Sequence, residues 1–183
     1  IVLSSSSSSQ LKTILIKSGL SGVWQSHSFP NKKWLILAVS QKMKDIFLNE
    51  WYSNIESSSS CTTYRIIKEN FRFENYLITT HNSRLTYITK FRTRNHKLPI
   101  ETGRWNSVNR EERLCTLCKQ DVGDEFHYLL VCKELNLLRR KFINKKYSQN
   151  PNIIKFKSLM NTKDILAFKQ LCNFVKIIME LFK

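Results

Sequence analysis

The sequence is poor in the residues that make tight turns, with only four glycines and three prolines among 183 residues. A β-sandwich or β-barrel needs frequent turns, and those turns draw on glycine and proline. Long stretches rich in Leu, Ile, Lys and Phe occupy the chain instead. We therefore expect a mainly α protein with one core and a small satellite element.

Long apolar runs are also absent. No stretch of eighteen apolar residues occurs and neither end carries a lipidation signal, so no membrane partner is expected. The chain starts with Ile1-Val2-Leu3 and six serines, without an initiator Met or a basic leader, and we expect a truncated reading frame, that is, a fragment. Five cysteines are too few, and odd in number, for a secreted disulfide framework. We expect an intracellular location, cytoplasmic or nuclear.

Acidic residues are scarce, with 14 Asp and Glu against 30 Lys and Arg and a formal net charge of +16. The excess grows along the chain: six cationic against three acidic residues in 1–60, eleven against five in 61–114 and thirteen against six in 115–183. Such a charge attracts a polyanion. RNA and/or DNA is therefore the expected partner.

Cys115, Cys118, His127 and Cys132 form a C-x2-C-x8-H-x4-C array. Three thiolates and one imidazole satisfy tetrahedral zinc, and the two-residue gap lets the first pair approach the ion from one tight turn. All four positions are filled by protein, so none remains for an activated water. We predict one structural Zn²⁺ in a CCHC zinc-knuckle-like element.

Two other roles for these cysteines are weaker. A redox CxxC needs a thioredoxin-like strand and helix around it, whereas residues 113–118 lie between polar segments. A chance grouping of buried cysteines stays open as the other alternative. Cys61 and Cys172 lack such partners and are expected to be small core residues.

Apolar spacing predicts helices on both sides of the array. We expect four regions: a low-complexity, poorly ordered start (1–19), a helical region (20–112), the zinc element (113–133) and C-terminal helices (134–183). The serine runs at 4–9 and 57–60 are expected to be loops. Residues 31–56 carry a helical stripe expected in the core, made of Leu35, Val39, Met43, Ile46, Phe47 and Trp51.

Two basic segments are candidates for nucleic-acid contact. The first, after a helical group in 62–95, interleaves cations with Phe91 and His96, which suits phosphate contacts beside stackable rings. The second, in 133–147, is expected to form one helix with a basic and an apolar face. Solvated helix ends are the alternative for the first segment. The predicted contact residues are Lys90, Arg92, Arg94, Lys97, Arg104, Arg139, Arg140, Lys141, Lys145 and Lys146.

The last segment, capped at Asn161 or Thr162, is expected to be a packing helix. Its stripe contains Ile165, Phe168, Leu171, Val175, Ile178 and Phe182. An exposed stripe of this size would seek a partner. The alternative function is therefore a zinc-stabilised interaction or docking module of a larger polyprotein.

Several stretches resemble the C-terminal zinc-binding region of LINE-type, non-LTR retrotransposon reverse transcriptases. They are Asn95-His96-Lys97-Leu98-Pro99, Thr102-Gly103-Arg104-Trp105, Glu112 to Cys118, Gly123 to Cys132, and Arg139, with Trp24, Phe47 to Trp51 and Tyr64-Arg65 extending the likeness over about residues 20–180. The resemblance implies a helical module that helps a reverse transcriptase grip its RNA template or target DNA, with the rest of that polyprotein as a partner. It gives the zinc-ligand role to the same Cys and His residues.

Catalytic residues are not expected in this chain. Polymerase chemistry needs clustered aspartates that hold two magnesium ions, and no two aspartates are adjacent. The only acidic cluster, Asp121, Asp124 and Glu125, lies inside the zinc loop, where hydrogen bonds to the ligands or the backbone are expected. His27, His81 and His96 have no sequence-visible nucleophile or acid partner. We therefore expect a fragment without the polymerase core and without enzymatic activity.

Overall fold

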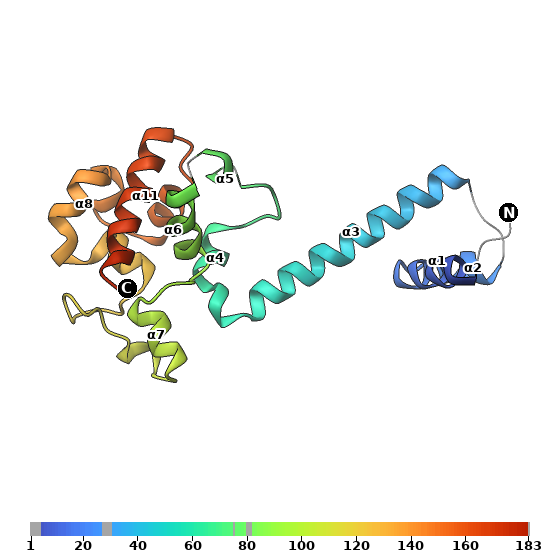
Figure 1. Cartoon of the computed structure of the whole chain (residues 1–183), viewed down its shortest axis with the longest axis horizontal. Coiled ribbons are helices and arrows are strands. Elements are labelled where there is room, and N and C mark those ends of the chain that lie inside the picture. Colours follow the sequence, from blue (N-terminus) through green and yellow to red (C-terminus); the bar gives the residue numbers. More distant parts are fainter. Residues whose placement is uncertain (1–4, 27–30, 75, 80–81, 183) are drawn as a thin grey trace. The chain divides into compact units, whose positions relative to one another are not determined.

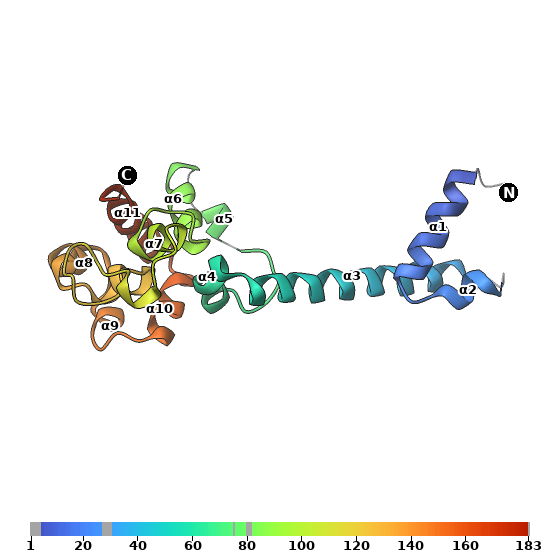
Figure 2. The same ribbon diagram turned by 90° about the horizontal axis from the view of Figure 1, so that it is seen from below.

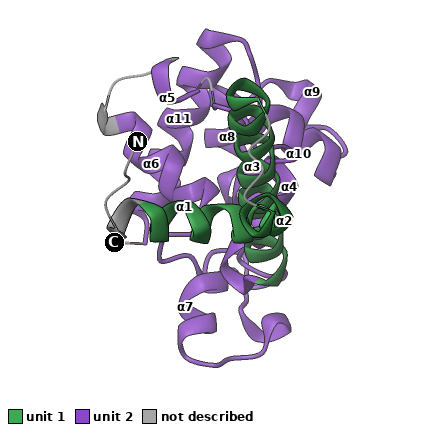
Figure 3. Cartoon of the chain, turned by 90° about the vertical axis from the view of Figure 1, so that its right-hand side faces the viewer, with its two compact units in different colours: residues 1–57 green, residues 58–183 purple. Residues whose placement is uncertain are grey.

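The structure is a computed structural model that describes residues 5–26, 31–74, 76–79 and 82–182, and within these ranges it is helical without a β-strand (Figure 1). The expectation of a mainly α fold is confirmed. The chain divides into two compact units, residues 1–57 and 58–183 (Figure 3). The division falls inside the region 20–112 that the sequence pattern grouped together, because the serines at 57–60 end a long helix. Among the described residues, no helix has both the length and the apolar character to span a membrane.

The first unit contains α1 (Ser5–Lys17), α2 (Ser21–Gln25) and α3 (Lys32–Ser57). Ser5 to Ser9 of the serine run expected as a loop form the start of α1, because serine is a tolerable helix former and the helix is anchored by the fully buried Leu15. Gly19 ends α1 with a φ of 70°. The N–H groups of Leu20 and Gly19 donate to the carbonyls of Leu15 and Ile16, the Schellman pattern that only a left-handed residue allows.

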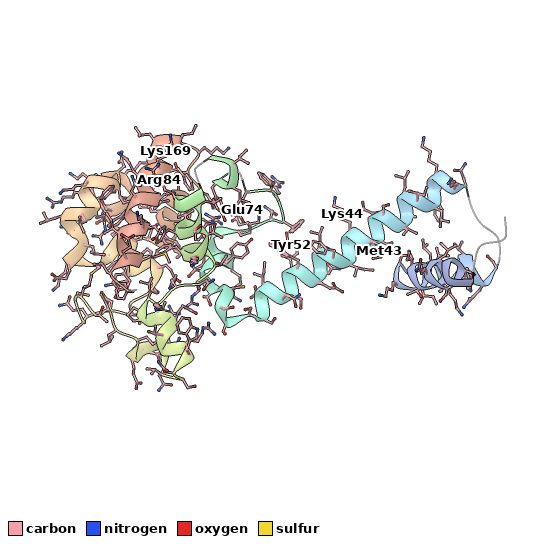
Figure 4. The ribbon with its side chains drawn as sticks, viewed as in Figure 1. Met43, Lys44, Tyr52, Glu74, Arg84 and Lys169 are labelled. Carbon is pink, nitrogen blue, oxygen red and sulfur yellow. The ribbon has the colours of Figure 1, made fainter. Side chains whose placement is uncertain are left out.

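The predicted helix over 31–56 is confirmed as α3, but its apolar stripe is not a core stripe. No residue of α3 is buried. Apolar residues at 34–37 follow one another and point about 100° apart around the helix axis, so no single face collects them. Met43, Lys44 and Tyr52 are all exposed on this helix (Figure 4).

The second unit holds the core. Its helices are α4 (Thr62–Ile67), α5 (Tyr76–Thr79), α6 (Asn82–Arg92), α7 (Pro99–Trp105), α8 (Asn136–Phe142), α9 (Lys145–Ser148), α10 (Ile153–Met160) and α11 (Ile165–Glu180). Helix α11 packs against α6 and α8 (Figure 1). The stretch 133–147, expected as one helix, breaks after α8 because Asn144 caps α9 by accepting a hydrogen bond from the Lys146 N–H.

The C-terminal segment is a packing helix, as predicted. Phe168, Leu171, Val175 and Ile178 are all buried, and Cys172 is buried beside them. Its cap is Asp164, whose carboxylate accepts from the Leu166 and Ala167 N–H groups, rather than Asn161 or Thr162. The docking alternative relied on an exposed stripe here, and most of that stripe is already covered within the unit.

Candidate metal centre and basic surface

The four residues of the predicted zinc array come together. One ligand atom from each of Cys115, Cys118, His127 and Cys132 lies within 4.8 Å of the others. The sulfurs of Cys115 and Cys132 are 3.8 Å apart, and the Cys118 sulfur is 3.3 Å from His127 Nε2. All but Cys118 are buried. This cluster can hold a metal ion.

A tight hairpin presents the first two ligands. Leu114 and Val122 pair in an isolated antiparallel bridge, and the Cys115 N–H donates to the Asp121 carbonyl at 2.8 Å. The turn closes where the Lys119 N–H donates to the Cys115 carbonyl, also at 2.8 Å. Gly123 allows a close approach at the end of the hairpin, because a Cβ there would stand only 3.0 Å from the Cys115 Cα and 3.0 Å from the Pro99 Cγ.

A helical turn presents the other two ligands. Asp124 starts it by accepting a hydrogen bond from the His127 N–H at 2.9 Å. The turn is a π-helix over His127–Val131, and the Cys132 N–H donates to the His127 carbonyl at 2.7 Å. The other ring nitrogen, His127 Nδ1, is 3.6 Å from an Asp121 carboxylate oxygen. Asp124 therefore makes a hydrogen bond of the predicted kind to a ligand's backbone, whereas Asp121 lies near the His127 ring beyond hydrogen-bond distance.

Burial and local hydrogen bonds shift the pKa values of three of the four ligands. Burial alone would raise the pKa of Cys115, but hydrogen bonds from the Cys118 and Leu117 backbone and the Tyr128 side chain lower it overall. Burial and the two neighbouring cysteines raise the pKa of Cys132 to about 12. Burial lowers the pKa of His127, which favours the neutral imidazole. Because metals bind thiolate and neutral imidazole, a bound cation would let all three sulfurs ionise together.

The metal element is part of the main core and not a satellite. Tyr128, Leu129 and Leu130 of the π-helix are buried in the same apolar cluster as residues of α6 and α11. The Tyr128 ring meets the Phe182 ring edge-on at 5.0 Å between centroids. The satellite expectation is wrong because the ligand turn itself carries three large core side chains.

Arg139, predicted to contact nucleic acid, is 3% exposed and serves the metal element instead. Its Nε donates to the Leu129 carbonyl at 2.8 Å and its Nη2 to the Cys132 carbonyl at 2.7 Å. The Leu129 carbonyl lies in the last turn of the π-helix, and the Cys132 carbonyl lies directly after it, where it also accepts from the Leu135 N–H at 3.3 Å. Arg139 therefore caps the turn that carries two of the ligands.

Arg139→Leu is expected to destabilise the protein by about 3 kcal/mol, because it leaves buried carbonyls without their charged donor. Urea unfolding followed by circular dichroism measures the change. Arg140→Leu is the matched control, since Arg140 is the exposed neighbour on α8 and should change stability by less than about 0.5 kcal/mol. Equal effects of the two variants would contradict the capping role.

Arg92 and Arg94 were also predicted to contact nucleic acid, and this prediction is wrong because both are buried. Arg92 is 2% exposed; its guanidinium donates to the Met160 carbonyl at 2.8 Å and pairs with Glu74 at 2.7 Å. Arg94 is 5% exposed and pairs with Glu101 at 2.7 Å and Glu125 at 3.2 Å. Both side chains are held by groups from other elements and do not face solvent.

A buried ionic cluster surrounds Arg94. Glu125 also accepts from Thr63 at 2.9 Å and meets His96 Nε2 at 2.8 Å, while Arg104 pairs with Glu101 at 2.6 Å. Glu125 therefore bonds to this cluster and not to a metal ligand, contrary to the prediction. His96 is placed as a structural partner, and His27 and His81 lie outside the described residues. Sequence reasoning missed this cluster because its members come from separate segments.

The remaining predicted cations are accessible. Lys90, Lys97, Arg140, Lys141, Lys145 and Lys146 are exposed, and Arg104 is half-buried beside Glu101. Of the rings expected to stack, Phe91 and His96 are both buried. The basic surface therefore consists mainly of lysines around α6 and on α8 and α9.

Comparison with protein-family models, with curated proteins and with solved structures finds no match to this chain. The resemblance to the retrotransposon zinc-binding region stays a prediction from the sequence.

Proposed function

We propose that this chain is a non-catalytic, zinc-stapled helical module that binds RNA or DNA. The observation that carries the proposal is the four-ligand cluster built into the core of a unit with 24 Lys and Arg against 11 Asp and Glu in residues 58–183. The cluster orders the unit, and the exposed cations supply attraction to phosphate. The setting in a non-LTR reverse transcriptase belongs to the same proposal and rests on the sequence resemblance.

Zinc is the ion that the donor set favours. Three thiolates and one imidazole are soft and borderline ligands, which select Zn²⁺ over magnesium or calcium. With Zn–S bonds of about 2.3 Å, tetrahedral geometry puts two sulfurs about 3.8 Å apart and a sulfur and a nitrogen about 3.6 Å apart. The observed separations of 3.8 Å and 3.3 Å are close to these values. Four protein ligands close the coordination sphere, which supports a structural ion.

Binding is tested by fluorescence anisotropy of the zinc-loaded protein with a structured RNA and with duplex DNA across a salt series. We expect affinity to fall steeply with salt, because each phosphate contact releases counterions. Replacing Lys141, Lys145 and Lys146 together with Glu should weaken binding and make the slope shallower by about 0.9 for each lost contact to duplex DNA.

The matched control replaces Lys33, Lys42 and Lys44 of α3 with Glu, which changes net charge equally on another exposed helix. This control should leave affinity nearly unchanged if the contacts are local. If both triple variants weaken binding equally, the loss of affinity comes from net charge and not from local contacts. The absence of binding at low salt would reject the proposed function.

A further inference from the structure

A surface pocket of about 540 Å³ is lined by residues of α6, the end of α7 and the end of α11. Figure 2 shows the ribbon of these three helices. Three of its lining residues are aromatic: Tyr87, Trp105 and Phe182. Lys90 and Lys97 line it as well, together with the amide of Asn95. Its volume falls in the range of about 300–1,000 Å³ that small-ligand sites occupy. The pocket thus combines flat apolar surface, positive charge and one amide in a single place.

Trp105 is the aromatic side chain most open to a ligand. It is the last residue of α7 and is 53% exposed, which is unusual for the largest apolar side chain. Tyr87 is fixed beside it in the pocket wall, because its hydroxyl donates to a Glu180 oxygen at 3.2 Å. Rigid rings of this kind are the platforms on which unpaired bases stack.

The charge of the pocket fits a phosphate backbone. Lys90 and Lys97 are both exposed, and among the described residues no carboxylate forms an ion pair with either of them. Lys90 lies in the last turn of α6, and Lys97 lies in the loop that connects α6 to α7. Cations beside an open ring match the alternation of base and phosphate along a single strand.

We propose that this pocket takes an unpaired nucleobase of a single-stranded RNA or DNA segment, which stacks on Trp105 while Lys90 and Lys97 contact the flanking phosphates. The inference rests on the proposed function and names the form of nucleic acid that this part of the surface selects. Bases inside a duplex are stacked on one another and do not offer a free face to Trp105.

The metal element holds two walls of this pocket. The Ile100 N–H donates to the Gly123 carbonyl at 3.2 Å, and the Arg113 guanidinium donates to the Ile100 carbonyl at 3.1 Å, so the ligand hairpin fixes α7 and with it Trp105. Phe182 rests on Tyr128 of the ligand turn. Because both contacts come from the metal loop, we expect loss of order in that loop to disturb the pocket.

The test uses the full zinc-loaded chain with two fluorescein-labelled probes, a 12-residue oligothymidylate and a 12-base-pair duplex. We expect Trp105→Ala to weaken oligothymidylate binding about thirtyfold, the middle of the range for removing one stacking ring, and to change duplex binding less than about twofold. Trp105→Phe should retain most of the affinity, because phenylalanine keeps a ring. Circular dichroism of each variant verifies that the helices are unchanged.

Lys141→Glu is the control for charge outside the pocket, since it should weaken the two probes by similar factors. Wild-type binding to both probes with no selective loss in Trp105→Ala would overturn the pocket and leave the proposed function standing. Failure of the wild-type chain to bind either probe at low salt would overturn the pocket, and if the structured RNA is not bound either, the proposed function falls with it. Selective loss on the single strand, restored by Trp105→Phe, supports the pocket.

Discussion

Replacing Cys132 with serine is expected to unfold residues 58–183 as a unit and not only the ligand loop. Cys132 and Cys115 are both buried in the apolar cluster that also contains Leu129 and the inward face of α11. Structural zinc in small motifs contributes an apparent binding free energy of about 10–16 kcal/mol at neutral pH. Domains of this size have an unfolding free energy of about 5–15 kcal/mol, so loss of the ion is expected to remove most of that free energy.

Thermal unfolding by circular dichroism, with zinc content measured in parallel, tests this expectation. The wild-type chain should contain one zinc per molecule, and Cys132→Ser should lose both the zinc and the cooperative transition. Cys61→Ser is the control, because Cys61 is half-buried outside the cluster and should keep both. Proteolytic cleavage of Cys132→Ser confined to residues 113–133 would contradict the expectation, since it would mark the metal element as separable from the core.

The metal site was predictable because its information is local. All four ligands lie within eighteen residues, and the spacings C-x2-C and H-x4-C correspond to one hairpin turn and one helical turn. The C-terminal packing helix was predictable for the same reason, since its apolar period repeats within one segment. Its cap was misplaced by two or three residues, which is the usual uncertainty of a helix end.

The burial of Arg92 and Arg94 was not predictable from the sequence, because partners far away in the chain decide whether a charged side chain is buried. The Met160 carbonyl that binds Arg92 is 68 positions away in the sequence, and Glu125 binds both His96 and Arg94 from another segment. A basic stretch looks the same whether its cations face solvent or such partners. The same limit applies to Trp105, whose importance appears only when α6, α7 and α11 come together around it.

Arg94→Met is expected to destabilise the protein by about 3–5 kcal/mol, because it removes one partner of a buried ionic cluster. Of its side-chain partners, Glu125 would keep His96 and Thr63, and Glu101 would keep Arg104. Arg104→Met is the matched control. It pairs with the same Glu101, but its side chain is 31% exposed and Arg94 remains to neutralise the carboxylate, so about 1 kcal/mol is expected. Urea unfolding of both variants at pH 7 provides the comparison.

The stability difference between wild type and Arg94→Met should depend on pH if its origin is electrostatic. Burial alone would raise the pKa of Glu125, but the hydrogen bond and charge of His96 and the charge of Arg94 bring that pKa below its ordinary value. The stability that ionised Glu125 contributes is therefore present above the unfolded pKa of about 4.3 and is lost as the pH falls through the folded value. Without Arg94 the pKa of Glu125 rises, so protonation relieves the buried charge at a higher pH. The gap between wild type and Arg94→Met should narrow as the pH falls towards about 4, whereas a gap of constant size would assign the loss to packing alone.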